Sequence, residues 1–231
     1  MTLLSIVQDA ADEIGWDRPT SVVGNADARQ FLRLLNREGE VLSKWPWQAL
    51  VKEHTFTLST ADQDYALPSD YRSMLPSTQW NRDNKRRIIW ITSEEWQFFK
   101  GWTTVNGLNL RARLRNNQFE FEQTITSSDN GKTIAFEYIS KNWTLDSASN
   151  AQQKFAADDD TAVLDEELLT MGLVWRFRKA KGLDFATELA EYQAEVQRMK
   201  AQDKVARKLN LSNSLKTSLG VNTQEGDYPS V

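Results

Sequence analysis

Few side chains in this sequence could do chemistry, and they do not form a known catalytic pattern. The chain has no cysteine and one histidine, His54, so a metal site built from Cys and His ligands is not expected. His54 lies in a predicted strand with Phe56 and Leu58, where a structural role is the simpler interpretation. The phosphate-binding patterns GxGxxG, GxxxxGKS and GxxxxGKT do not occur in the sequence. We therefore expect no catalytic residue, no cofactor and no bound metal.

Asp158, Asp159 and Asp160 form an acidic run that could bind a cation. The run lacks the spaced ligands and the glycine of a calcium-binding loop, so we favour a solvated loop. A hydrolase would need a carboxylate with a raised pKa in a cleft. The sequence singles out no such carboxylate, and a hydrolase stays an alternative.

A segment rich in basic and aromatic residues lies between positions 80 and 90. Such a mixture can bind single-stranded nucleic acid, and a nucleic-acid-binding module is the alternative function. The net charge of −4 differs from the strongly basic balance of most nucleic-acid-binding proteins, so we favour a solvated hairpin tip. Contact with an acidic neighbouring subunit or a tail protein is a further hypothesis, and its residues are Trp80, Arg82, Lys85, Arg86, Arg87 and Trp90.

The composition is that of a globular protein. Hydrophobic residues make up 40% of the 231 residues and charged residues 26%, which argues against wholesale disorder. Nine tryptophans predict either a Trp-rich core or exposed contact surfaces, because Trp is enriched at interfaces. The start of the chain does not resemble a signal peptide, and no apolar run approaches the ~18 residues of a spanning helix. We expect a protein made in the cytoplasm, with no membrane partner.

Two helices are predicted near the N-terminus. Apolar residues recur at helical spacing over residues 3–14, and Gly15 is expected to end that helix. Asp27 is predicted to cap the second helix, with Gln30 as its partner in a capping box. Pro46 should end this helix, because the residue before a proline avoids helical dihedrals.

The middle of the chain is predicted to be rich in β-structure. Residues 51–58 and 87–92 suit strands, and Ser93 is expected to cap a short helix that ends at Gly101. Apolar residues alternate with polar ones over residues 108–115, which indicates a half-buried strand.

Two turns are predicted to join three strands into a meander. A turn at residues 116–117 sets apolar pairs on the dry face and Arg–Glu pairs on the wet face. A second turn at residues 130–131 would then pair Ile125 with Phe136. The pairs expected across the first turn are Leu114–Phe119, Ala112–Phe121, Arg113–Glu120 and Arg111–Glu122.

The last third is predicted to be helical. Asp165 can cap a helix that Gly182 ends, and Asp184 can cap the next one. The short joint between the two predicts an antiparallel helical hairpin. After Leu209 the apolar pattern ends, so residues 210–231 are expected to be an extended tail that is either disordered or ordered only on a partner.

The order of these parts resembles the head-to-tail adaptor, or connector, proteins of tailed phages, including the tail-accessory-factor type of short-tailed phages. The resemblance rests on a helix pair ending in WPW (residues 45–47) and on YALPSDY (residues 65–71). It also rests on a β-rich insertion and on a helical region with the sequence DEELLTMGLVWRFRKAKGLDFATELAEY (residues 165–192).

The resemblance implies a mainly α fold with a β-rich insertion, of class α+β. We expect a bundle of about four helices, an antiparallel β meander and an extended C-terminal tail. One adaptor domain would cover residues 1–209. Its helical parts would be residues 1–50 and 160–209, its β-rich insertion residues 51–150, and its tail residues 210–231.

The resemblance also implies a structural virion protein rather than an enzyme. Such proteins assemble as a dodecameric ring at the head–tail junction, after synthesis in the host cytoplasm. The ring would lengthen the channel for DNA, which passes without sequence specificity, and offer a platform for the tail. The expected partners are the portal protein, a tail or nozzle protein and further copies of this chain. The portal-binding residues would be Asn210, Leu211, Leu215, Leu219 and Tyr228.

Overall fold

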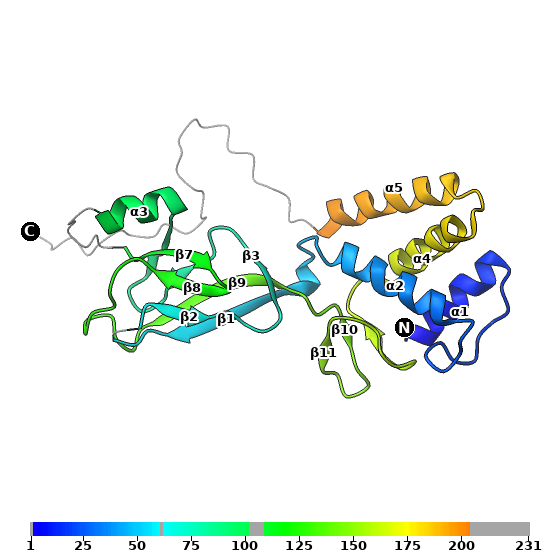
Figure 1. Cartoon of the computed structure of the whole chain (residues 1–231), viewed down its shortest axis with the longest axis horizontal. Helices are drawn as coiled ribbons and strands as arrows, with labels where there is room; N and C mark the ends of the chain where they lie inside the picture. The colour runs from blue at the N-terminus through cyan, green and yellow to red at the C-terminus, as the bar shows by residue number, and fades with distance from the viewer. Residues whose placement is uncertain (1, 61, 102–108, 204–231) are drawn as a thin grey trace, which may run out of the picture.

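The computed structural model describes residues 2–60, 62–101 and 109–203, which form two lobes lying end to end (Figure 1). The first, here called the helical lobe, contains most of the helices and a small sheet. The second, here called the β lobe, contains two further sheets and one helix. Each lobe has its own cluster of buried apolar side chains. The division into a domain of residues 1–209 and a tail stays a prediction, because residues 204–231 lie outside the described part.

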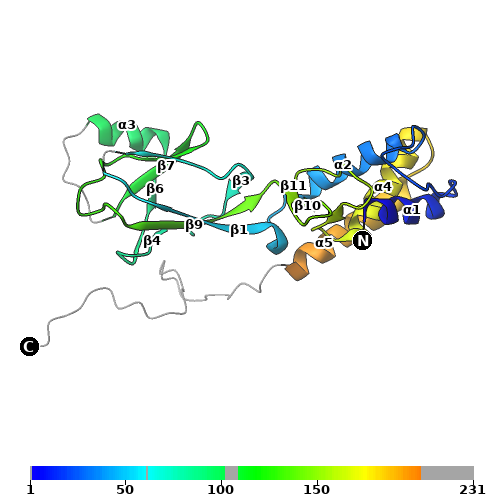
Figure 2. The same cartoon turned by 90° about the horizontal axis from the view of Figure 1, so that it is seen from below.

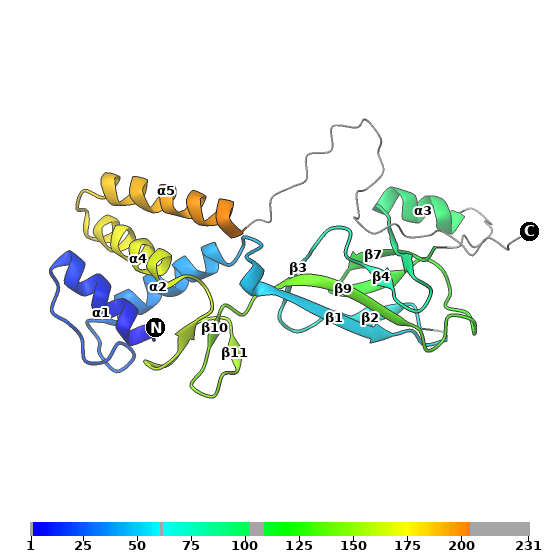
Figure 3. The same cartoon turned by 180° about the vertical axis from the view of Figure 1, so that it is seen from behind.

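The helical lobe is built around one central helix. This is α4, which packs against α1, α2 and α5 and lies between α2 and α5 when seen from behind (Figure 3). The hairpin of α4 and α5 confirms the predicted antiparallel pair. The elements of this lobe are α1 (Leu3–Ile14), α2 (Arg29–Leu42), α4 (Glu166–Lys181), α5 (Ala186–Asp203), and the strands β10 (Thr144–Leu145), β11 (Ala151–Gln152) and β12 (Thr161–Ala162).

Local capping explains most of the helix ends. Gly15 and Gly182 adopt left-handed backbone conformations with φ of 71° and end α1 and α4, as predicted. The Asp165 carboxylate accepts a hydrogen bond from the Leu168 N–H and begins α4, also as predicted. The capping box expected at Asp27 is wrong, because α2 begins at Arg29 without a side-chain cap.

Two further boundaries differ from the sequence prediction. Helix α2 ends at Leu42, before Pro46, because the backbone turns at Ser43 and continues toward a short 3₁₀ helix, η1 (Gln48–Leu50). The short helix α3 (Ser93–Gly101) was expected to be capped by Ser93, but its cap is Thr92, one residue earlier, in a capping box with Glu95. Its Thr92 hydroxyl accepts from the Glu95 N–H, and the Glu95 carboxylate accepts from the Thr92 N–H.

The β lobe is a sandwich of two sheets. The strand order is β1-β9-β4-β5 in one, with β3 also paired to β9, and β2-β8-β7-β6 in the other. Phe119 and Phe121 from the second sheet face Ile134 and Phe136 from the first, inside one core. The strands are β1 (Val51–Thr57), β2 (Asp64–Ala66), β3 (Tyr71–Met74), β4 (Trp80–Asn81), β5 (Arg86–Arg87), β6 (Ile89–Trp90), β7 (Arg111–Arg115), β8 (Gln118–Phe121) and β9 (Thr133–Ser140).

The first predicted hairpin is confirmed, pair by pair. Strands β7 and β8 join Ala112 to Phe121, Arg113 to Glu120 and Leu114 to Phe119. The guanidinium Nε of Arg113 donates to the Glu120 carboxylate at 2.8 Å, and that of Arg111 to the Glu122 carboxylate at 3.0 Å. The face that was expected to be exposed to solvent is instead covered by α3. Trp96 of this helix packs on Arg113, with 3.7 Å between the guanidinium Cζ and the centroid of the tryptophan ring.

The predicted three-stranded meander is wrong. Strand β9 pairs with β1 over seven residues, including Phe56 with Ile134, and does not pair with β8. β1 offers β9 a long partner of matching apolar alternation, whereas β8 is already bordered by β2 and β7. Ile125 lies in the core outside any strand.

The predicted fold class, mainly helical with a β insertion, is also wrong. The described residues form five α-helices and twelve strands in three sheets. Sheets supply a complete second core, and Trp143 and Phe155, from the region of the small sheet, enter the helical core. Half of the strands are only two residues long, and a strand that short has no alternation to be found in a sequence.

Within the described residues no helix is long and apolar enough to cross a membrane.

The two lobes are joined by strands that leave and re-enter the helical lobe. Figure 2 shows β1 leaving the end of the helical lobe and β9 running back beside it. Trp143, which follows β9, is fully buried and packs edge-on against Phe155 at 5.1 Å between ring centroids. Gly39 of α2 makes room for this ring, because a Cβ there would lie 2.1 Å from Trp143 Cη2.

We predict that Gly39→Ala destabilises the protein, although alanine normally favours a helix. The added methyl group would overlap a rigid, buried ring, so we expect a loss of about 3 kcal/mol in the free energy of unfolding. Urea denaturation followed by circular dichroism measures this loss. Gly101→Ala is the matched control, because its Cβ would meet nothing within 4 Å. Equal stability of the two variants would contradict the close approach of α2 and Trp143.

Candidate interaction surfaces

His54, the single histidine, is surrounded by aromatic rings. Its ring centroid lies 5.4 Å from that of Phe136 and 6.2 Å from that of Phe56. Burial lowers the pKa of His54, and the carboxylate of Asp70 only partly offsets this. Among the described residues, no three Asp, Glu, His or Cys side chains are grouped so as to hold a metal ion. The surroundings of His54 are those of a structural residue.

The acidic run is not the solvated loop that the sequence predicted. The buried Asp160 carboxylate accepts from the N–H groups of Ala156 and Ala157 at 2.6 and 2.9 Å. The Asp158 carboxylate accepts from the Ser21 hydroxyl and from the N–H groups of residues 22 and 23. Burial raises the pKa of Asp158, but these donors outweigh burial and lower it. The run ties the segment after α1 to the loop before β12.

Asp70 plays a similar structural part in the β lobe. Its carboxylate accepts from Lys52 Nζ and from the hydroxyls of Tyr138 and Ser140, each at 2.8 Å. These groups come from β1 and β9, so Asp70 holds the segment before β3 against the strands that connect the lobes. Burial raises the pKa of Asp70, but the three donors together bring it below its ordinary value.

The helical lobe contains a fully buried acid that the sequence prediction missed. Glu38 on α2 has no exposed surface, and its carboxylate accepts from Arg176 Nε on α4 and from the Tyr192 hydroxyl on α5. Burial and the adjacent Glu38 carboxylate raise the pKa of Tyr192. Gly172 faces this carboxylate, because a Cβ there would lie 2.5 Å from Glu38 Cγ. The sequence does carry a signal for this buried acid, because Glu38 is a charged residue at a core position among the apolar residues of α2.

The structure divides the predicted basic and aromatic cluster between two sheets. Trp80 and Arg87 are directly paired in β4 and β5, so their side chains share one face of the first sheet. Trp90 belongs to the second sheet and packs edge-on against Phe119. Arg86 lies opposite Asn81, on the other face from Trp80.

The face that carries Trp80 has a shallow groove of about 580 Å³, lined also by Arg82 and Lys85. Glu53 and Glu137 line the same groove, and the Glu53 carboxylate pairs with Arg82. Carboxylates beside the cations oppose the binding of phosphates. The groove therefore suits a protein of mixed charge better than a nucleic acid.

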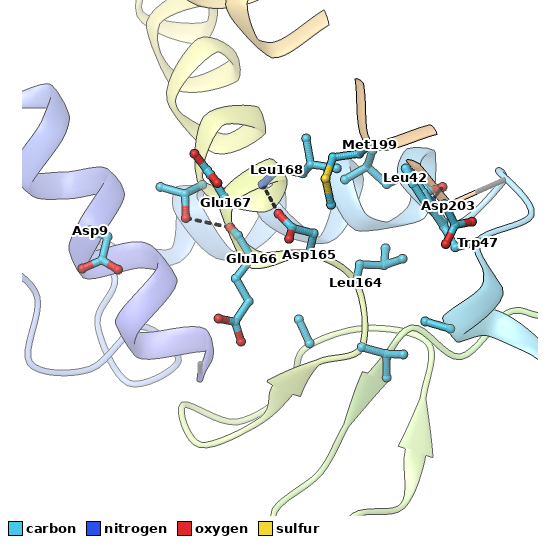
Figure 4. A pocket seen from close by; sticks show the side chains of 14 residues that line it. Asp9, Leu42, Trp47, Leu164, Asp165, Glu166, Glu167, Leu168, Met199 and Asp203 are labelled. Atoms are coloured by element: carbon cyan, nitrogen blue, oxygen red, sulfur yellow. Dashed lines mark hydrogen bonds between the residues drawn. The ribbon is translucent and has the colours of Figure 1, made fainter. Parts of the chain in front are cut away.

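A larger groove, which the sequence prediction missed, crosses the helical lobe (Figure 4). It has a volume of about 850 Å³ and an apolar floor that includes Leu42, Trp47, Leu164, Leu168 and Met199. Its rim carries carboxylates from α1, from the start of α4 and from the end of α5. We call it the acidic groove. Its acidic residues are Asp9, Asp165, Glu166, Glu167 and Asp203, and among residues 2–60, 62–101 and 109–203 no Lys or Arg lines it.

The predicted portal-binding residues lie outside the described part of the chain. They fall within residues 204–231, as does the whole predicted tail.

The two interpretations of the tryptophans both apply to the described residues. Trp16 and Trp90 are exposed, whereas the buried ones are Trp47, Trp96, Trp143 and Trp175.

The sequence of this chain matches the model of a known protein family. The sequence model of the family described as SU10 adaptor protein matches residues 1–218. No match was found among curated proteins.

We predict that Glu38→Gln lowers the free energy of unfolding by about 3 kcal/mol, because it leaves the largely buried Arg176 without its counter-charge. Replacing the whole cluster with Glu38→Met, Arg176→Met and Tyr192→Phe should recover most of this loss, since no buried charge remains. Thermal and urea denaturation of both variants provide the measurement. A Glu38→Gln protein as stable as the unmodified one would show that the cluster does not hold the helices together.

Proposed function

Because the chain belongs to the SU10 adaptor protein family, we propose that its copies form a ring between the portal and the tail of a phage particle. A member of this family is a structural phage adaptor and interacts with other head and tail proteins. We propose a dodecameric ring that extends the DNA channel, holds packaged DNA and gives the tail a platform. The observation that carries this proposal is the family match, which covers both lobes.

The chemistry of the described residues supports a scaffold. Glu38, Asp70 and Asp158 are each satisfied by donors of the protein itself. Carboxylates held in this way stabilise one conformation and are poorly placed to exchange protons with a substrate. The protein would be made in the host cytoplasm and take its place in the virion at the head–tail junction.

The C-terminal tail is the part that we propose to bind the portal. Residues 210–231 follow the last described helix and have no apolar periodicity of their own. A segment of this kind gains order by binding a partner. We propose that Asn210, Leu211, Leu215, Leu219 and Tyr228 make these contacts.

We predict that a chain ending at residue 209 keeps its fold and loses portal binding. Circular dichroism and the melting temperature test the fold, and co-sedimentation with the portal protein tests binding. We expect an unchanged melting temperature and at least a tenfold loss of affinity. Portal binding that is equal with and without residues 210–231 would place the contact elsewhere.

The face of the β lobe that carries Trp80 is the surface that we propose for a tail or nozzle protein. Trp80, Arg82, Lys85 and Arg87 gather on or beside this face, whereas Arg86 and Trp90 point elsewhere and would contribute to separate subunit contacts. A half-buried tryptophan within a mixed-charge groove resembles the anchor residues of protein interfaces.

We predict that Trp80→Ala weakens the binding of the tail protein to a preformed portal–adaptor complex by tenfold or more. The portal–adaptor complex itself should form normally. Surface plasmon resonance with the immobilised complex measures the affinity. Trp16→Ala, which removes an exposed tryptophan from the helical lobe, is the control. Unchanged tail binding by Trp80→Ala would exclude this face.

A further inference from the structure

Helix α2 carries a row of arginines on its solvent side. Arg29, Arg33 and Arg37 are spaced four residues apart, so they follow one another along a single face, and all three are exposed. Val41 continues the row one turn further and is 45% exposed. We call these four residues the arginine stripe.

The guanidinium groups of the arginine stripe have no bonding partner within the described residues. Residues 2–60, 62–101 and 109–203 contain no hydrogen bond, ion pair or ring contact for any of its three guanidinium groups. Other cations of the helical lobe are engaged: Arg176 with Glu38, Arg178 with Glu188 and Arg198 with Glu195. Three adjacent guanidinium groups that repel one another are the surface that a carboxylate-rich partner would stabilise.

The acidic groove has the opposite character. It combines an apolar floor with five carboxylates, and none of the described residues that line it is a lysine or an arginine. Asp9 is exposed and has no partner within the described residues, and Glu167 is exposed in the first turn of α4. Arg198 is close enough to attract the carboxylates of Asp165 and Glu167, but its guanidinium group forms an ion pair with Glu195. The groove therefore keeps a surplus of negative charge.

The two surfaces lie on opposite sides of the helical lobe. Leu42 extends into the acidic groove from the buried side of α2. Arg33 precedes Leu42 by nine residues, which is about two and a half helical turns, so its side chain points in the opposite direction. Figure 4 shows α2 behind α4 when the groove faces the viewer. One molecule thus presents a cationic surface on one side and an anionic groove on the other.

We propose that neighbouring copies of the chain join by docking the arginine stripe of one copy into the acidic groove of the next. Complementary surfaces on opposite sides of one molecule form a heterologous interface, which closes into a ring when the rotation per copy is suitable. The arginines would bind the rim carboxylates, and Val41 would lie on the apolar floor. This inference rests on the proposed ring and identifies the surfaces that build it.

Charge reversal of each surface gives the test. The stripe variant carries Arg33→Glu and Arg37→Glu, and the groove variant carries Asp9→Arg and Glu167→Arg. All four side chains are exposed, so we expect melting temperatures close to that of the unmodified chain. Arg115→Glu, an exposed reversal in the β lobe, is the control. Sedimentation velocity with the portal protein measures how many copies assemble on each portal.

We expect each variant alone to lose ring assembly by at least tenfold and the control to assemble normally. An equal mixture of the two variants should assemble again. In the mixture, the glutamate-bearing stripe of the stripe variant can bind the arginine-bearing groove of the groove variant. The unchanged arginine stripe of the groove variant can bind the unchanged acidic groove of the stripe variant. Restoration by mixing cannot arise from a general effect of net charge.

Three outcomes would overturn the inference. Normal rings from both variants would show that other surfaces join the copies. Loss in the groove variant alone would assign the groove to the basic segment of residues 204–219. Loss in the stripe variant without restoration by mixing would assign the stripe to another partner, such as DNA. The proposed function fails separately, if the unmodified chain forms no ring on the portal.

Discussion

The buried carboxylate of Glu38 is the constraint on which the helical lobe depends. A fully buried charge without partners would cost many kcal/mol, so α2 is held in the one orientation that brings Glu38 to Arg176 and Tyr192. Gly172 allows this contact from α4, and Gly39, the next residue on α2, receives the ring of Trp143. One turn of α2 thus joins two helices and the segment that returns from the β lobe.

This fixed rotation of α2 also determines what the molecule presents to its surroundings. With Glu38 directed inward, the arginine stripe must face solvent and Leu42 must face the acidic groove. In the β lobe, Asp70 fixes the connecting strands in the same way, because its carboxylate collects donors from both β1 and β9. The proposed contacts with a second copy and with the tail therefore lie on rigid elements, where a small interface loses less conformational entropy on binding.

Local signals in the sequence predicted the helices and the hairpin of β7 and β8, because caps, turns and charge pairs lie within a few residues of one another. The partner of β9 could not be predicted, since β1 lies about eighty positions earlier in the sequence and two-residue strands carry no pattern. The acidic groove was missed for the same reason, since Asp9, Glu167 and Asp203 come from three separate helices. Glu38 could have been found as an acid within the apolar stripe of α2, with Gly39 beside it.

The most direct test of the adaptor role is electron cryo-microscopy of the unmodified chain mixed with the portal protein. We predict a second ring of this chain, coaxial with the portal and attached to it, with the helical lobes forming the continuous part of the ring. Portal particles without added density, in the presence of an excess of folded monomer, would contradict the proposed function.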